Sequence, residues 1–94
     1  GPILGKRRPV VIIQSNLYNN DLEACIVCPI TSNIVENINY LRVQLPKDQI
    51  DKKSDILIDQ IRTIENRKLI KKLSTLNNEQ IKKIKRNLQI ILDL

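Results

Sequence analysis

The segment at residues 9–15, PVVIIQS, constrains the fold most, because four β-branched residues follow one another without a polar interruption. A run of this kind is typical of a strand that is covered on both faces. The chain has no Trp or Phe and only two Tyr, so aliphatic side chains must do the covering. A chain of 94 residues is the length of one domain. A domain of this size buries only about 60–70% of the surface that its unfolded chain exposes. We therefore expect residues 1–94 to form a single domain with a core of Ile, Leu and Val.

Three further segments carry strand patterns. Residues 24–30, ACIVCPI, form a second apolar run, and Pro29 suggests that its end lies on an edge or at a bulge. Residues 41–45 and 55–64 alternate apolar and polar side chains, as half-buried strands do. We expect residues 46–54, which lie between them, to form a charged loop.

The alternation across residues 55–64 places Asp59 among apolar neighbours on its own face. A carboxylate in such surroundings is either a capped structural group or a functional group with a tuned pKa. The residue pattern by itself favours the structural role.

The C-terminal segment predicts a helix. Asn77 is a suitable N-cap, and Gln80 three residues later completes a capping-box spacing. Apolar residues then recur at helical spacing and form one stripe, at Ile81, Ile84, Leu88 and Ile91. Residues 69–73 add a short strand or a turn before it. Together, the predicted strands and helix indicate an α+β domain with a small antiparallel sheet and a C-terminal helix.

The net charge of +6 is concentrated near the C-terminus, since residues 66–94 hold eight basic and two acidic residues. A localised basic surface attracts phosphate backbones or acidic proteins. For the helical lysines alone, the pattern favours a solvated helix face. The apolar runs are far shorter than the roughly 20 residues of a transmembrane helix, and the chain does not begin with a signal peptide. We expect a cytoplasmic protein without membrane contact.

The residue types exclude several chemistries. Without His there is no Ser-His-Asp triad, no Cys-His pair and no His-based ribonuclease mechanism, and two glycines at positions 1 and 5 cannot form a Walker loop. Cys25 and Cys28 are three residues apart on a strand and point to opposite faces, so we expect packing residues and no metal or cofactor. Catalysis would have to use Arg, Asp, Glu, Lys, Tyr or hydroxyl groups. Such groups suit stabilisation of a phosphoryl transition state.

Three motifs, in their order and spacing, resemble the MazF/PemK toxins. GKRRPVV at residues 5–11 enters a strand, CPITSN at 28–33 ends a second strand, and DQIRTI at 59–64 lies near a third. The similarity continues through Arg67 and the helical tail. It therefore covers nearly the whole chain from Gly5 onward.

The resemblance implies a small SH3-like antiparallel β-barrel with a C-terminal helix, assembled as a homodimer. It implies the toxin of a bacterial type II toxin–antitoxin system, a metal-independent endoribonuclease that cleaves single-stranded mRNA. In such enzymes the ribose 2′-oxygen attacks the adjacent phosphate. The resemblance also implies a cognate antitoxin with an acidic, partly disordered tail that blocks the RNA groove.

Residue roles follow from the same resemblance. Arg8, the arginine before proline, corresponds to the residue that holds the scissile phosphate, and Thr31 to the threonine that donates to it. Asp59 corresponds to the acid that PemK-type members use in proton transfer. Other positions correspond to residues that attract RNA, line its groove or support it: Lys6, Arg7, Ser32, Asn33, Gln60 and Arg62.

The chain departs from the family pattern near its start. Ile3 stands where members usually place an acid or a histidine, and the family's first strand has no counterpart here. The sequence also lacks Met, and Gly1-Pro2 is typical of the scar left by tag removal. We therefore expect an N-terminally truncated toxin domain.

Removal of a strand exposes unpaired backbone groups. This leaves open a second function, a catalytically weakened or inactive module that dimerises and binds antitoxin or nucleic acid. The barrel that the resemblance implies is shared with gyrase-poisoning toxins, so a third function is a toxin of that kind, against which the Arg8 and Thr31 motifs speak.

Overall fold

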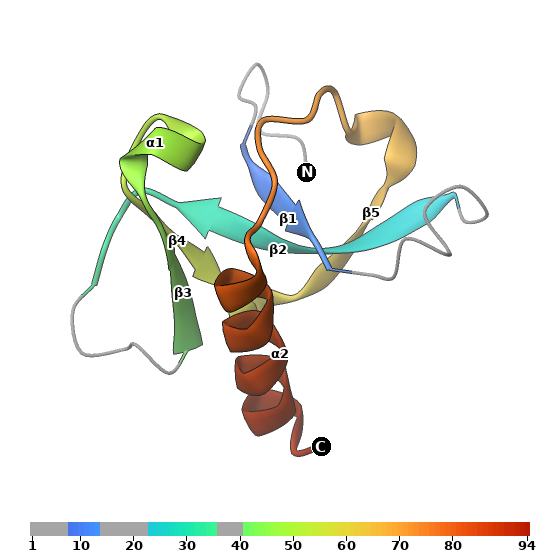
Figure 1. The fold of residues 1–94 in the computed structure, drawn as a ribbon. Helices are drawn as coiled ribbons and strands as arrows, with labels where there is room; N and C mark the ends of the chain where they lie inside the picture. The colour runs from blue at the N-terminus through green and yellow to red at the C-terminus, as the bar shows by residue number, and fades with distance from the viewer. Residues whose placement is uncertain (1–7, 14–22, 36–40) are drawn as a thin grey trace.

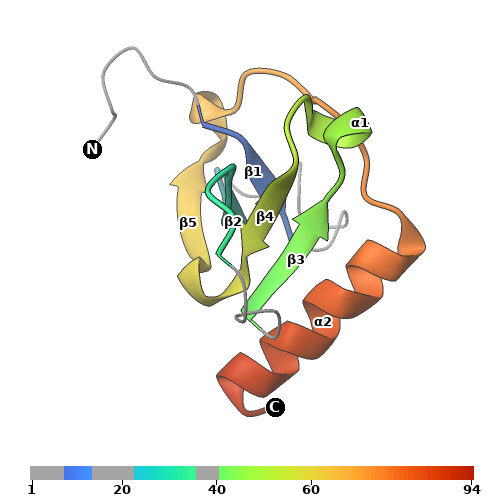
Figure 2. The same cartoon turned by 90° about the vertical axis from the view of Figure 1, so that its left-hand side faces the viewer.

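Strand β2, Ala24–Thr31, organises the fold because it pairs with three other strands. The computed structural model describes residues 8–13, 23–35 and 41–94. In this part of the chain one antiparallel sheet has the strand order β1 (Val10–Ile12), β2, β4 (Ser54–Leu57), β3 (Arg42–Leu45), and a fifth strand, β5 (Arg62–Glu65), also pairs with β2 (Figure 1). Helix α2, Asn78–Leu92, lies beside the sheet (Figure 2). The predicted α+β architecture with an antiparallel sheet and a C-terminal helix is confirmed, and the described strands do not close into a barrel.

The apolar run at residues 9–15 contains β1, Val10–Ile12, while residues 14 and 15 lie outside the described part. β1 pairs with the middle of β2, with Val10 opposite Pro29 and Ile12 opposite Val27. The run is therefore a strand, as predicted.

Pro29 lies at a local edge within β2, which agrees with the prediction of an edge or a bulge near the end of this strand. β2 continues through Pro29 to Thr31 and changes its partner on one side there. The ladder with β5 ends at Val27, and the ladder with β4 begins at Ile30. Since Ile30 donates its N–H to the Pro9 carbonyl on the β1 side at 3.2 Å, its neighbour Pro29 presents its backbone nitrogen to the other side. No ladder is present there, so the missing donor costs no hydrogen bond.

The alternating segment at residues 55–64 is not one strand, contrary to the prediction. It divides into β4, Ser54–Leu57, the 3₁₀ turn η3, Ile58–Gln60, and β5, Arg62–Glu65. β4 pairs with the end of β2 and with β3, Arg42–Leu45, which confirms the strand predicted there. The turn redirects the chain so that β5 pairs with the start of β2. Asp59 consequently lies exposed on the turn, and not on an apolar strand face.

The segment at residues 46–54 is also more structured than predicted. It contains a short helix α1, Lys47–Ile50, which begins after Pro46. Ile50 packs against the core, and the Gln49 side chain donates to the side-chain oxygen of Gln80 in α2 at 2.9 Å. The expected loop therefore connects β3 to α2 as well as to β4.

Helix α2 begins as the sequence predicted. The Asn77 side chain accepts from the Gln80 backbone N–H at 2.9 Å, and the Gln80 side chain accepts from the Asn77 backbone N–H at 3.0 Å. Ile84 is buried in the core and Leu88 and Ile91 pack against it, but Ile81 is 37% exposed and does not belong to the buried stripe. Before the helix the chain makes a 3₁₀ turn η4, Asn66–Lys68, and residues 69–77 are irregular, so no strand forms at 69–73.

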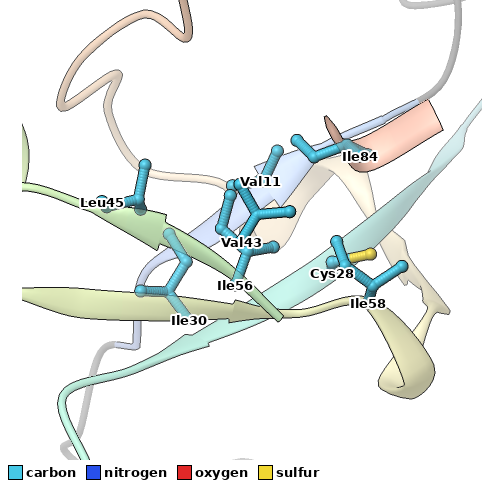
Figure 3. Packing of buried hydrophobic residues seen from close by; sticks show 8 residues of the cluster. All are labelled: Val11, Cys28, Ile30, Val43, Leu45, Ile56, Ile58 and Ile84. Carbon is cyan, nitrogen blue, oxygen red and sulfur yellow. The ribbon is translucent and has the colours of Figure 1, made fainter. Parts of the chain in front are cut away.

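The core lies between the sheet and α2. Figure 3 shows Ile84 of the helix directed at side chains from four strands and the turn η3. Its buried members are Val11, Cys28, Ile30, Val43, Leu45, Ile56, Ile58 and Ile84. Both cysteines are free and buried, and only Cys28 belongs to this cluster. Aliphatic residues therefore form the core, as the lack of Trp and Phe requires.

Candidate functional site

The end of β2 brings two of the predicted catalytic residues to one level of the sheet. The hydrogen bond from Ile30 to Pro9 extends the β1–β2 ladder one residue beyond β1. Continuing this register by one more residue puts Arg8 opposite Thr31. Side chains of directly opposed residues lie on the same face of an antiparallel pair. Arg8 is exposed and Thr31 is half-buried, so a ligand can reach this position.

Thr31 starts a tight turn that we call the Thr31–Asn33 turn, residues 31–33. The Asn33 backbone N–H donates to the Thr31 hydroxyl oxygen at 3.1 Å. The hydroxyl thus accepts a hydrogen bond from its own turn, which fixes its rotamer, and it retains one donor of its own. Ser32 and Asn33, both predicted to line an RNA groove, lie exposed on this turn.

An ion pair of Arg42 and Asp55 supports the turn, and sequence reasoning missed it. The Nη1 atom of Arg42 donates to the Asn33 carbonyl at 3.0 Å and lies 3.4 Å from Asp55 Oδ2. Asp55 stands directly opposite Thr31 on β4, and only 4% of its side chain is exposed. Its other oxygen, Oδ1, is buried with no hydrogen-bond partner among the described residues.

The third predicted catalytic residue, Asp59, lies exposed on the turn η3, beyond the end of β4. The register between β2 and β4 ends before this turn, so it does not place Asp59 relative to Thr31. The neighbouring Gln60 is exposed on the same turn.

Asp59 instead acts on the electrostatics of Cys28. Burial of the Cys28 thiol raises its pKa to about 11, and the negative charge of Asp59 adds to the effect in the same direction. Burial also raises the pKa of Cys25. Both thiols are consequently protonated at neutral pH, which is consistent with packing residues and makes them poor nucleophiles.

Of the three remaining predicted site residues, Arg62 lies in the described part of the chain. Arg62 is exposed at the start of β5, opposite Val27 of β2. Lys6 and Arg7 lie outside the described residues.

No group of three or more Cys, Asp or Glu side chains among the described residues could hold a metal ion. Within those same residues, no helix is long and apolar enough to cross a membrane.

Comparison with known proteins identifies the fold and the family. The model of a family described as PemK-like, MazF-like toxin of type II toxin-antitoxin system matches residues 1–92. The chain belongs to this family. It is 35% identical over 92 residues to the Endoribonuclease MazF of Staphylococcus saprophyticus, spanning 96% of this chain and 77% of that protein. The resemblance to MazF/PemK toxins that the motifs indicated is therefore confirmed.

Solved structures of MazF toxins share the fold at lower sequence identity. The Mycobacterium tuberculosis toxin MazF-mt6 superposes with a TM-score of 0.84 at 22% identity, over 93% of this chain and 87% of that one. An endoribonuclease in complex with its cognate antitoxin from Mycobacterial species has a TM-score of 0.79 at 20% identity, over 97% and 86% of the two chains. The five strands and the C-terminal helix of this chain thus share the fold of these solved structures.

Proposed function

We propose that this MazF-family chain is an endoribonuclease toxin that cleaves single-stranded mRNA without a metal ion. The observation that carries the proposal is the register that brings Arg8 opposite Thr31 at one end of the β1–β2 ladder. The 35% identity to a protein named Endoribonuclease MazF supports the reaction class.

In the proposed reaction the ribose 2′-oxygen attacks the adjacent phosphorus, and the bond from phosphorus to the 5′-oxygen breaks. The products are a 2′,3′-cyclic phosphate and a 5′-hydroxyl end. Arg8 stabilises the charge that develops on the phosphoryl oxygens, because a guanidinium offers a planar pair of donors. The Thr31 hydroxyl donates the second hydrogen bond to the same phosphate.

The 2′-hydroxyl proton must leave and the 5′-oxygen must gain one, and we assign Asp59 to this transfer. Ser32 and Asn33 on the Thr31–Asn33 turn, with Gln60 and Arg62 near Asp59, bind or support the RNA strand. Lys6 and Arg7 supply attraction for its backbone. The positive charge of α2, which carries Lys82, Lys83, Lys85 and Arg86 against Glu79, adds long-range attraction to the same polyanion.

We propose a homodimer, and a cognate antitoxin with an acidic, partly disordered segment as the partner that blocks the site. The relative whose structure contains its cognate antitoxin supports this partner. The basic charge of the chain is complementary to an acidic segment.

A fluorogenic single-stranded RNA assay in EDTA tests the function. The wild-type chain is expected to cleave, and Arg8→Ala is expected to lower the rate about 10²–10³-fold, the usual loss for one transition-state charge contact. Arg67→Ala is a matched control, because Arg67 is also an exposed arginine but pairs with Glu65 at the far end of β2. Circular dichroism verifies that both variants keep the fold. Equal cleavage by wild type and Arg8→Ala would refute the assignment.

A second candidate is a module that no longer cuts but still dimerises and binds antitoxin or nucleic acid. Ile3 favours it, because this residue stands where family members usually place an acid or a histidine. Binding of an RNA oligonucleotide without cleavage of it, in the same EDTA assay, would select this candidate.

A further inference from the structure

We propose that Arg42 and Asp55 are positioning residues for the reaction, a role that rests on the proposed function. Asp55 fixes the guanidinium of Arg42, and Arg42 holds the Thr31–Asn33 turn through the Asn33 carbonyl. The pair thereby presents the Thr31 hydroxyl to the phosphate.

The register of the sheet explains why these two side chains meet. Arg42 stands opposite Leu57 and Gln44 opposite Asp55, so Arg42 and Asp55 are diagonal neighbours on one face of the β3–β4 pair. A diagonal separation is within reach of a long side chain. Asp55 is also the direct opposite of Thr31 in the β2–β4 pair. One carboxylate therefore lies between Arg42 on one side and Thr31 on the other.

The hydrogen bonds form a continuous chain from the buried carboxylate to the hydroxyl. Asp55 Oδ2 lies 3.4 Å from Arg42 Nη1, and the same nitrogen donates to the Asn33 carbonyl at 3.0 Å. The Asn33 N–H then donates to Thr31 Oγ1 at 3.1 Å. The N–H and the carbonyl of Asn33 are thus both held beyond the end of β2, which is at Thr31.

The charges of Arg42 and Asp55 affect the binding of a phosphate beside Thr31. A buried carboxylate directly opposite Thr31 would repel the RNA backbone if it stood alone, and its second oxygen has no partner among the described residues. Arg42 compensates this charge, and 18% of its side chain is exposed to solvent. Loss of Arg42 alone therefore both frees the turn and leaves an uncompensated negative charge.

If Arg42 and Asp55 formed only a structural ion pair, removing them would lower the stability of the fold without a separate loss of catalysis. Two variants distinguish the roles. Arg42→Met should destabilise the fold and impair RNA binding, because it isolates the Asp55 charge. The double variant Arg42→Met/Asp55→Val removes both charges, so stability should largely return. It still lacks the link to Asn33.

The experiment measures kcat and KM on a single-stranded RNA, the melting temperature, and amide hydrogen exchange at Asn33, for both variants and a control. The control is Glu65→Val/Arg67→Met, an exposed ion pair at the opposite end of β2. For the double variant we expect kcat to fall about 10²-fold, as misplacement by about 1 Å costs. We also expect faster exchange of the Asn33 N–H, with both values unchanged in the control.

A double variant with wild-type kcat and unchanged Asn33 exchange would overturn the proposal. If the wild-type chain cleaves no RNA, the proposed function fails, and Asn33 exchange alone then decides whether Arg42 and Asp55 hold the turn. Slow exchange in the double variant would overturn the inference in that case also.

Discussion

The buried thiol of Cys28 makes the stability of this protein depend on pH in the alkaline range. Cys28 is fully buried in the core, beside Ile58 in Figure 3. Burial, and secondarily the charge of Asp59, raises its pKa from the ordinary 9.0 to about 11. The unfolded chain therefore releases the thiol proton at a lower pH than the folded chain does.

The sign and size of the effect follow from this difference. Below pH 9 both states keep the proton, and the free energy of unfolding carries no penalty. Between pH 9 and about 11 only the unfolded state ionises, so the free energy of unfolding falls as pH rises. The full difference corresponds to at most about 3 kcal/mol.

Urea unfolding at several pH values between 8 and 11 measures this dependence. The quantity of interest is the difference between wild type and Cys28→Ala, because this difference isolates the thiol from every other group. Cys28→Ala should lose less stability across the range. Asp59→Asn should reduce the loss by a smaller amount, because the Asp59 charge is the lesser cause. An identical pH dependence in wild type and Cys28→Ala would refute the reasoning. An unchanged dependence in Asp59→Asn would contradict the position of Asp59 near Cys28.

Two further substitutions test the fold. Asn77→Ala should lower the free energy of unfolding by about 0.5–2 kcal/mol, because it removes one half of the capping box; Asn78→Ala, one residue later and exposed, is the control, and equal losses would contradict the cap. Ile56→Ala should cost about 2–5 kcal/mol in urea unfolding, since Ile56 is fully buried between Ile30 and Val43. A loss below 1 kcal/mol would contradict the packing of this core.

Local patterns predicted the parts of the fold that local interactions determine. The capping box depends on Asn77 and Gln80, which are three residues apart, and β2 on one continuous apolar run. The division of residues 55–64 was not predictable in the same way. Neither Gly nor Pro marks the turn at Ile58–Gln60, and the adjacent polar residues Asp59 and Gln60 do not by themselves specify a turn.

The candidate site was likewise predictable only where a local pattern marks it. Arg8 and Thr31 were found through motifs, and their common level depends on a β1–β2 register that the sequence does not state. Arg42 and Asp55 belong to different strands, 13 residues apart. The sequence did indicate that the two residues deserve notice, since Arg42 and Asp55 are charged residues within the first two positions of the strand segments 41–45 and 55–64. Only the pairing of β3 with β4 turns the two charges into one contact.

The central claim is that Arg8 and Thr31 act together on one phosphate, and a double-mutant cycle tests it most directly. The measurement is the rate and the end groups of single-stranded RNA cleavage in EDTA for wild type, Arg8→Ala, Thr31→Ala and the double variant. We predict 2′,3′-cyclic phosphate ends from the wild type, and a double variant that is hardly slower than Arg8→Ala, because residues that act as a unit are not additive. Cleavage that leaves 3′-hydroxyl ends, or losses that simply multiply in the double variant, would contradict the account.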